Sequence, residues 1–421
     1  MHDINFIREN QKHFEDMMAS RKIRPDTEKI LQLDNIKRNL KTNIQKLQND
    51  RNKTSKLIGE YKKNNKDSIA LEKNVHLLKY SISKEESKLN EISLELDNIL
   101  LQLPNLPSKD VPVGKDDSFN KEIYRSKNFN IQDDCISHDD LGKNIDMMDF
   151  ENAAKMSGAR FVILKKDLAK LERALCNFMI DLHVRKHSYI ETSTPHLVKD
   201  TALIGTGQLP KFKDDLFNVS NQKWLIPTAE VTLTNLHSNS LLKAEDLPKR
   251  YVALTNCFRS EAGSAGLDTK GMIRLHEFKK VELVSLVQQE NSEEELERLT
   301  NCASSVLELL QIPFRKVLLS SGDMGFSASK TYDLEVWLPS QKKYREISSC
   351  SNCKDFQSRR LISRYKDNTG NKKFIHTLNG SGVAVGRALV AIIENYQMGK
   401  EKVKVPDVLI EYMGGQREIS I

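Results

Sequence analysis

Apolar residues between positions 68 and 103 recur at alternating steps of four and three. All of these positions but one are apolar: Leu71, Val75, Leu78, Ile82, Glu85, Leu89, Ile92, Leu96, Ile99 and Leu103. A repeat of this kind is the seam of a coiled coil, so the pattern predicts one long helix.

A matching seam lies upstream, interrupted by Lys37 and Arg51. Its members are Ile30, Leu33, Leu40, Ile44, Leu47, Ile58 and Tyr61. The polar stretch Lys62–Asp67 separates the two seams and predicts a short turn. Two helices joined by a short turn pack antiparallel, and about 35 residues at ~1.5 Å each give an arm roughly 50 Å long.

The helical periodicity ends at two closely spaced prolines, Pro104 and Pro107, which predict a domain boundary. We expect an arm domain over 1–104, an irregular, polar linker or peripheral segment over 105–155, and a domain of mixed helices and strands over 156–421. Within residues 156–421, the pattern predicts an amphipathic helix over Asp167–His187. Strands are predicted at Trp224–Ile226, Tyr251–Phe258, Ile273–Leu283, Tyr332–Leu338 and Lys343–Ser349. Few intervals between them suit βαβ crossovers, so the predicted fold class is α+β, with an antiparallel sheet flanked by helices.

Composition narrows the class of protein. The 421 residues carry a formal charge of +7 and a mean hydropathy of −0.52, low for a compact globule and consistent with an elongated, solvated part. No run approaches the ~18 apolar residues of a membrane span, and the first residues resemble neither a signal nor a transit peptide. Six scattered cysteines fit a reducing compartment. We therefore expect a cytoplasmic protein.

Charge is unevenly distributed over the arm. Residues 35–66 hold ten basic and two acidic side chains, whereas residues 67–103 hold four basic and seven acidic ones. A solvated helix face explains many such patterns, but the concentration favours a clamp for a phosphate backbone. Interleaved aromatics are nearly absent, which favours shape recognition of a folded RNA over base stacking. The predicted contact residues are Lys37, Arg38, Lys41, Lys46, Arg51, Lys53 and Lys56.

The stretch 258–283 carries the densest candidate chemistry. Its second half alternates, with one face apolar and the other bearing Arg274, His276, Phe278, Lys280 and Glu282. The preceding loop opens with Arg259 and Glu261. Cations, an aromatic plane and a carboxylate on one face can hold a nucleotide and a zwitterion together, so we predict a binding site here.

Glycines at positions 380, 382 and 386 precede a predicted helix that runs through Gln397. A glycine loop at a helix N-terminus suits anion binding, although close packing of a helix on a sheet is an alternative explanation. Their spacing matches neither the dinucleotide fingerprint nor a P-loop. Arg387 in the first helical turn faces the positive end of the helix dipole and favours an anion nearby.

Three further motifs are candidates for ligand contacts. Glu346, Ser348 and Ser349 supply a carboxylate and two hydroxyls, oxygen groups of the kind that Mg²⁺ prefers. The pair Cys350-x-x-Cys353 lacks the second pair or histidines typical of a zinc site. The tripeptide from Thr228 to Glu230 follows an apolar strand, and taken alone it is unremarkable.

Taken together, these strings resemble a known family. The helix 167–187, FRSE…GMIRLHEFKKVEL and NGSGVAVGR are similar in order and kind to motifs 1, 2 and 3 of the class II aminoacyl-tRNA synthetases. With the arm, IPTAE, GTGQLPKF and EISSCSNC, nearly the whole chain resembles the bacterial-type seryl-tRNA synthetases. The resemblance implies a homodimer built around motif 1 that activates L-serine with ATP and Mg²⁺ and transfers it to tRNA(Ser), whose long variable arm the helical arm would bind. Service to tRNA(Sec) is left open.

The resemblance also implies residue roles. Thr228, Ala229, Glu230, Glu282 and Ser381 would bind serine. ATP would contact Arg259, Ser260, Glu261, Phe278, Glu346, Ile347, Ser348, Ser349 and Arg387. Among these, Arg259 and Arg387 would be catalytic, and Glu346 and Ser349 would ligate Mg²⁺. Phe278 would stack beneath adenine.

Two segments leave alternatives open. Leu267 is apolar where the family commonly carries a basic residue, which puts contact with the tRNA acceptor end in question. The stretch GTGQLPKF, residues 205–212, is either a loop that closes over substrate or a packed surface loop.

Two other functions compete with the synthetase hypothesis. One is a paralogue that loads an amino acid onto a carrier protein, which we expect to lack the long arm. The other is a catalytically silent RNA-binding coiled-coil protein, which the joint presence of Arg259, Glu346 and Arg387 argues against.

Overall fold

The computed structural model of the chain describes residues 1–127, 135–219, 222–262 and 270–420. The chain divides into two compact units at the Leu103–Pro104 bond. One spans His2–Leu103; the other spans Pro104–Ile421 and includes Met1. Each unit is described separately.

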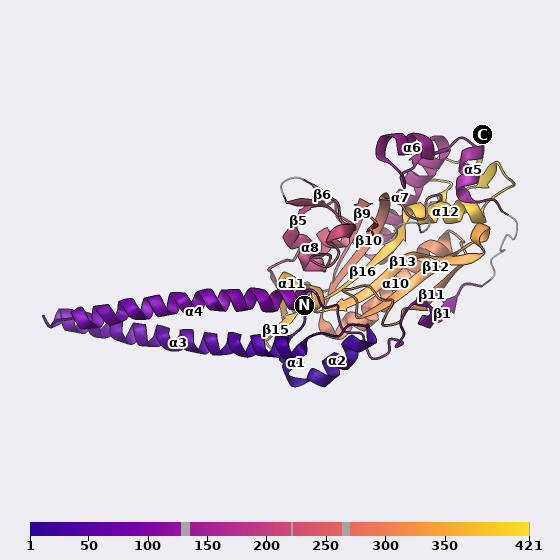
Figure 1. Ribbon diagram of the computed structural model, residues 1–421. Helices are drawn as coiled ribbons and strands as arrows, with labels where there is room; N and C mark the ends of the chain where they lie inside the picture. Colours follow the sequence, from indigo (N-terminus) through magenta and orange to yellow (C-terminus); the bar gives the residue numbers. More distant parts are fainter. Residues whose placement is uncertain (128–134, 220–221, 263–269, 421) are drawn as a thin grey trace. The chain divides into compact units, whose positions relative to one another are not determined.

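The first unit is a helical hairpin with two short helices at its start (Figure 1). Its helices are α1 (Ile4–Glu9), α2 (Gln11–Ser20), α3 (Thr27–Lys63) and α4 (Ile69–Leu101). Asp26 caps α3 by accepting a hydrogen bond from the backbone N–H of Lys29 at 3.0 Å. Helices α3 and α4 lie side by side along their lengths, which confirms the antiparallel pair predicted from the two seams.

An eight-stranded sheet forms the centre of the second unit (Figure 1). In spatial order its strands are β1 (Lys121–Arg125), β11 (Phe314–Leu318), β12 (Lys330–Leu338), β13 (Lys343–Lys354), β16 (His376–Ala384), β10 (Glu277–Val287), β9 (Lys249–Phe258) and β4 (Ile190–Glu191). All neighbours are antiparallel except β4 and β9. The predicted α+β class with an antiparallel sheet is therefore confirmed.

Three helices cover one face of this sheet and build the core against it. They are α7 (Lys166–His187), α10 (Ser292–Leu309) and α12 (Val385–Asn395). The apolar side chains of β10 predicted to share one face, Val281 and Leu283, are fully buried in this core. Charged and polar side chains of the same strand consequently point to the opposite face.

Smaller elements surround the sheet. The helices are α5 (His138–Asn144), α6 (Phe150–Ser157), α8 (Asp200–Thr206), α9 (Glu230–Asn235) and α11 (Phe356–Leu361). The strands are β2 (Met148–Asp149) with β3 (Ile163–Leu164), β5 (Leu197–Lys199) with β7 (Lys223–Leu225) and β6 (Asn218–Val219), β8 (Leu241–Lys243) with β14 (Arg364–Lys366) and β15 (Lys372–Phe374), and β17 (Lys402–Lys404) with β18 (Glu418–Ser420). The segment expected to be irregular, residues 105–155, thus contributes one strand to the main sheet and two helices.

The glycine-rich stretch is a strand rather than the predicted loop, so that expectation was wrong. Residues 376–384 form β16 in the middle of the sheet, and α12 begins at Val385. A Cβ on Gly380 would lie 2.4 Å from Leu299 of α10, and one on Gly382 would lie 2.6 Å from His183 of α7. These glycines let two helices approach the sheet closely, which is the alternative explanation considered above.

No helix among the described ranges combines the length and the apolar character needed to cross a lipid bilayer.

Candidate active site

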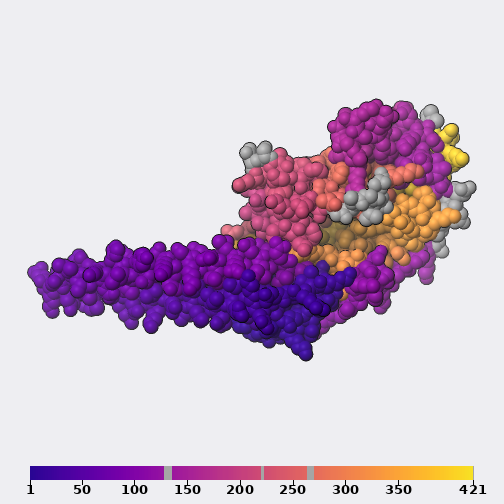
Figure 2. Space-filling model, viewed as in Figure 1, coloured from indigo at the N-terminus to yellow at the C-terminus, as the bar shows by residue number. Residues whose placement is uncertain are grey.

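A cleft of about 740 Å³ lies on the face of the sheet opposite α7, α10 and α12. It continues into a second pocket that shares several of its walls. The surface is visibly hollowed between the rose-coloured segment around α8 and the orange strands of the sheet (Figure 2). Eleven predicted site residues, charged, polar and apolar, line the two pockets: Thr228, Glu230, Arg259, Glu261, Phe278, Glu282, Glu346, Ile347, Ser349, Ser381 and Arg387.

Two carboxylates define the acidic end of the cleft. The Oε1 atom of Glu230 accepts hydrogen bonds from Nε2 of Gln357 at 2.6 Å and from Nδ2 of Asn379 at 2.9 Å. Burial and the nearby charge of Glu282 raise the pKa of Glu230 to about 7. Glu282 itself is 2% exposed, and its Oε2 lies 2.6 Å from Nζ of Lys280. One buried cation, Lys280, thus partly balances a buried acid, Glu282, and a partly buried acid, Glu230.

The small polar residues predicted beside these acids differ in their orientation. Oγ1 of Thr228 lies in the cleft wall and accepts the backbone N–H of Glu230 at 3.2 Å. Ser381 pairs directly with Glu282 across β16 and β10, which places both side chains in the same wall. The side chain of Ala229 packs away from the cleft, in a small core with Leu233.

Arginines define the other end of the cleft. The guanidinium of Arg259 lies over the ring of Phe278, 5.3 Å from its centroid. The backbone of Arg259 is held on both sides by His276, through hydrogen bonds of 2.9 Å. Nη1 of Arg274 lies 2.6 Å from Oε2 of Glu261. Arg259, Arg274 and Phe278 therefore line one pocket, as predicted for this segment. The predicted strand Ile273–Leu283 begins only at Glu277, however, so Arg274 reaches the pocket from the turn before β10, and Ile273 and Leu275, expected on the opposite face, line the same pocket.

Arg387 closes this end from α12. Its Nη1 donates to the backbone carbonyl of Glu346 at 2.6 Å and lies 3.4 Å from the Oε2 carboxylate oxygen of Glu346. Half of the Glu346 side chain is exposed to the cleft. Partial desolvation opposes its charge, but the guanidinium groups of Arg387 and Arg259 outweigh this effect and hold the pKa of that carboxyl below its usual value. The carboxylate of Glu346 is thus an anion beside Arg387, of the kind expected near the N-terminus of α12.

A strand irregularity decides which residues of 346–349 reach the cleft. The pairing of β12 with β13 shifts between Glu346 and Ser348, so Glu346 and Ser349 both line the cleft although they are three residues apart. Ser348 is buried and its hydroxyl donates to the carbonyl of Ser381 at 2.5 Å. Ile347 is 1% exposed and belongs to the core, although it also forms part of the pocket wall.

Ser260 lies outside the lining of both pockets. Its hydroxyl donates to the carbonyl of Asp214, and its backbone N–H donates to the carbonyl of Asp215 at 3.0 Å. The side chain therefore fastens the neighbouring turn, whereas the family resemblance implies a contact with ATP.

The oxygen-rich pair Glu346 and Ser349 has a third neighbour that the sequence analysis missed. Asp333 pairs with Ser349 across β12 and β13, and its buried Oδ1 has no hydrogen-bond partner. Burial and the charge of Glu346 raise the pKa of Asp333 well above its usual value. An orphaned oxygen beside a carboxylate and a hydroxyl matches the donor chemistry of a hard cation. Within the described residues, no group of three or more His, Cys, Asp or Glu side chains forms a metal site by itself.

Several lining residues could not be found by sequence reasoning. Gln357 and Asn379 reach Glu230 from α11 and β16, far away in the chain, so no local pattern marks them. Lys280 was placed on the correct face by its alternation but received no role. The stretch GTGQLPKF contributes Gln208 and Phe212 to the cleft wall.

The cysteine pair cannot chelate one metal ion. Cys350 packs beneath Gly380 on the core side, whereas Cys353 lines a pocket on the cleft side and lies 3.5 Å from Nδ2 of Asn379. The two thiols therefore lie on opposite sides of β13.

The predicted basic residues of the arm all lie on α3, in two groups. Lys37, Arg38 and Arg51 engage Asp97, Asp34 and Asn52. The second group is exposed and forms no ion pair within the described arm; it consists of Lys41, Lys46, Lys53 and Lys56. Leu267 lies outside the described residues. Lys270 forms ion pairs with Asp140 at 3.0 Å and Asp139 at 3.5 Å.

Comparison with known proteins gives consistent matches to both units. Residues 1–107 match the family model of the seryl-tRNA synthetase N-terminal domain, and residues 211–396 match that of the tRNA synthetase class II core domain (G, H, P, S and T). The chain is 54% identical to a serine–tRNA ligase of Rhodospirillum centenum, covering 100% of this chain and 99% of that relative. It is 48% identical to that of Rickettsia prowazekii, with the same coverage.

Solved structures show the same fold. The chain superimposes on the seryl-tRNA synthetase of Pyrococcus horikoshii complexed with ATP with a TM-score of 0.90 and 34% identity, covering 100% of this chain and 99% of that one. The cytoplasmic serine–tRNA ligase of Naegleria fowleri in complex with AMP gives a TM-score of 0.86 and 29% identity, covering 100% and 98%.

Glu230 makes the stability of the second unit depend on pH. Its pKa of about 7 in the folded state exceeds its ordinary value of 4.5, so its contribution is fully present below pH 4.5 and is lost as pH rises through 7. Glu230→Gln cannot ionise and keeps an amide oxygen for its two donors. We expect it to stabilise the unit by about 1–3 kcal/mol at pH 8 and by almost nothing at pH 4.5.

Urea unfolding followed by tryptophan fluorescence measures this effect, because both tryptophans, Trp224 and Trp337, lie in the second unit. Glu401→Gln changes an exposed carboxylate and serves as the control. Equal gains for Glu230→Gln at both pH values contradict the shifted pKa.

Proposed function

Because the chain belongs to the seryl-tRNA synthetases, a family of class II aminoacyl-tRNA synthetases, we propose that this cleft joins L-serine to ATP and passes the activated serine to tRNA. The chain is a serine–tRNA ligase, and ATP is its substrate. We also propose which residues contact serine and which contact ATP.

The observation that carries the proposal is the meeting of two differently charged ends in one cleft. The end with Glu230 and Glu282 suits an ammonium group and a hydroxyl. The end with Arg259 and Arg387 suits phosphates. A serine at the first end presents its carboxylate toward the second, where the α-phosphate of ATP would lie.

The amino-acid end has the chemistry to recognise serine. Glu282 would accept hydrogen bonds from the substrate ammonium group. The positive charges of that group and of Lys280 would together balance the two acids. Glu230, fixed by Gln357 and Asn379, would accept the substrate hydroxyl, with Thr228 and Ser381 beside it. A site whose buried polar groups need that hydroxyl rejects alanine, because those groups would otherwise be unpaired.

The nucleotide end requires one rearrangement. Phe278 is proposed to stack on adenine and Arg259 to hold the α-phosphate, yet Arg259 now lies over Phe278. We propose that Arg259 leaves the ring when adenine arrives and turns toward the phosphates. Glu261 would bind the adenine edge and Arg387 the terminal phosphate. Ser260 supports this wall through its bonds to Asp214 and Asp215 rather than through ATP.

Activation is a substitution at phosphorus that needs no general base. A carboxylate oxygen of serine attacks the α-phosphorus, a new O–P bond forms, and the bond to the leaving pyrophosphate breaks. The arginines align the two substrates and offset the charge that develops on the phosphate oxygens. In the second step a hydroxyl of the 3′-terminal ribose attacks the serine carbonyl. The new ester C–O bond forms, the C–O bond to AMP breaks, and the hydroxyl proton is released to solvent.

Mg²⁺ fits the oxygen groups at Glu346 and Ser349, with the orphaned oxygen of Asp333 behind them. Because these groups alone do not form a complete set, the ATP phosphates would provide the remaining ligands. When bound, the ion would neutralise phosphate charge.

We propose that the helical arm of the first unit binds the long variable arm of tRNA(Ser). We also propose a cytoplasmic homodimer formed around α7 and the edge strand β4, whose Ile190 is 56% exposed.

Arg259→Ala is expected to lower the rate of serine-dependent ATP–pyrophosphate exchange by at least ~100-fold, because it removes the cation proposed to hold the α-phosphate. Arg417→Ala, which removes an exposed arginine of the same unit, is the matched control and should exchange normally. A rate near that of the wild type for Arg259→Ala would show that the α-phosphate is held elsewhere. Wild-type exchange over a panel of amino acids tests the function itself, and its absence with serine would refute it.

Replacing the four unpaired lysines of α3, Lys41, Lys46, Lys53 and Lys56, by alanine should raise KM for tRNA about tenfold or more and flatten its salt dependence, because fewer phosphate counterions are released. Serine activation should remain unchanged. Alanine at the four lysines Lys73, Lys79, Lys84 and Lys88 of α4 is the matched control. An equal loss in both variants would contradict a basic edge confined to α3.

A further inference from the structure

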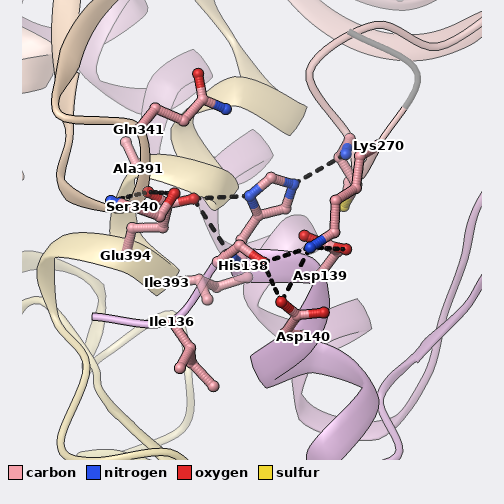
Figure 3. Close-up of polar contacts among 12 residues, drawn as sticks. Ile136, His138, Asp139, Asp140, Lys270, Ser340, Gln341, Ala391, Ile393 and Glu394 are labelled. Carbon is pink, nitrogen blue, oxygen red and sulfur yellow. Dashed lines mark hydrogen bonds and ion pairs between the residues drawn. The ribbon is translucent and has the colours of Figure 1, made fainter. Parts of the chain in front are cut away.

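A buried polar cluster lies behind the nucleotide end of the cleft, between α5 and α12 (Figure 3). At its centre are His138, which is 2% exposed, and Glu394, which is fully buried. Nδ1 of His138 lies 2.8 Å from Oε1 of Glu394. Neither residue lines the cleft, and the proposed reaction does not use them.

The hydrogen bonds determine the protonation of this pair. The backbone N–H of Met272 donates to Nε2 of His138 at 3.0 Å, so Nε2 carries no proton. Nδ1 must then carry the proton, and it donates a hydrogen bond to Glu394. Oε1 of Glu394 also accepts the backbone N–H of His138 at 3.3 Å, and Oε2 accepts the N–H and hydroxyl of Ser340 at 3.2 and 2.7 Å. Four donors from the described residues thus satisfy the carboxylate.

The imidazole of His138 connects this buried cluster to the wall of the nucleotide pocket. Met272 precedes Ile273 and Arg274, and all three line that pocket. The carbonyl of Ile273 accepts a hydrogen bond from Nε of Arg387 at 3.4 Å. Two adjacent residues of the wall are therefore tied to α12, one through Arg387 directly and the other through His138 and Glu394.

The spacing on α12 makes both ties possible. Arg387 and Glu394 are seven residues apart, about two helical turns, so they project from the same helix face. The segment that carries His138 is also fastened to the chain just beyond the end of α12, because Gln397 accepts the backbone N–H of Ile136 at 3.0 Å and donates to its carbonyl at 2.7 Å. His138 thus links α12 to the pocket wall through one hydrogen bond at each ring nitrogen.

The backbone passes so close to the imidazole that a side chain has no room. Gly271 has a φ of +73°, and a Cβ there would lie 2.2 Å from Nε2 of His138. Lys270 is held nearby through its ion pair with Asp140 (Figure 3). The hydrogen bond between Met272 and His138 therefore forms where the backbone at Gly271 packs directly against the buried imidazole, not at the surface.

We propose that His138 is a positioning residue for ATP: through its neutral, Nδ1-protonated imidazole it fixes the wall Met272–Arg274 at the distance from Arg387 that the nucleotide requires. The inference rests on the proposed nucleotide site. It predicts that losing the imidazole weakens ATP binding selectively, because the serine end is built on Glu230, Glu282 and Ser381, which the cluster does not touch.

The test is the KM for ATP and the KM for serine in pyrophosphate exchange. His138→Ala leaves the buried Met272 N–H and Glu394 without their partner, and we expect KM for ATP to rise about tenfold while KM for serine changes less than about twofold. His138→Gln offers an amide oxygen to Met272 and should return KM for ATP to within about threefold of the wild type. Hydrogen exchange of the Met272 amide should accelerate in the first variant and recover in the second.

His376→Ala is the matched control. It also removes a partly buried imidazole, bonded to Ser292 at 2.8 Å, but that imidazole does not line the cleft. It should lower the urea midpoint and leave both KM values unchanged. An equal rise of both KM values in folded His138→Ala, or no rise in either, would overturn the inference. Should that variant not fold, the same comparison in His138→Gln decides, since an unchanged KM ratio with a fast-exchanging Met272 amide would contradict it. Lack of exchange by the wild type would instead contradict the proposed function.

Discussion

The site depends on the two-sided character of the central strands. In β10, β13 and β16, alternate side chains enter the core under α7, α10 and α12, and the others face the cleft. The core side is packed so closely that Gly380 and Gly382 have no space for a side chain. Because each strand is held by that packing, a one-residue slip would exchange core and cleft residues. The positions of Glu282, Ser349 and Ser381 follow from this constraint.

Buried charge is the second constraint on the site. The fold places two acids, Glu230 and Glu282, against one lysine, and this lowers the stability of the free protein above the pKa of Glu230. At the other end Glu346 and Arg387 neutralise each other, while Arg259 rests on Phe278. Serine and ATP supply the charges that these groups lack: an ammonium group for the acids, and phosphates for the arginines. Binding energy and catalysis therefore come from the same uneven distribution of charge.

The sequence predicted features that depend on local periodicity and could not predict those that depend on tertiary register. The helical arm and α7 were predictable, because a seam repeated over several turns has one structural solution. The glycine stretch was predicted as a loop although it is β16, since glycine signals both turns and close packing. The roles of Ser260 and Ser348 depend on which way one side chain turns, and the pairing shift in β13 that brings Glu346 and Ser349 together leaves no sequence signal. Gln357, Asn379 and His138 act through contacts with residues more than a hundred positions away or on separate elements. Only the tertiary fold brings Gln357 and Asn379 to Glu230 and His138 to the backbone of the pocket wall.

The most direct test of the account compares two adenylate analogues that differ by one hydroxyl. Calorimetry would give the dissociation constants of the seryl and alanyl sulfamoyl adenosines for the wild-type protein. If the cleft joins a nucleotide end to an end whose buried carboxylates need the serine hydroxyl, the seryl analogue should bind about 10³-fold more tightly or better. Affinities within about tenfold of each other would contradict the assignment of Glu230 and Glu282 to serine.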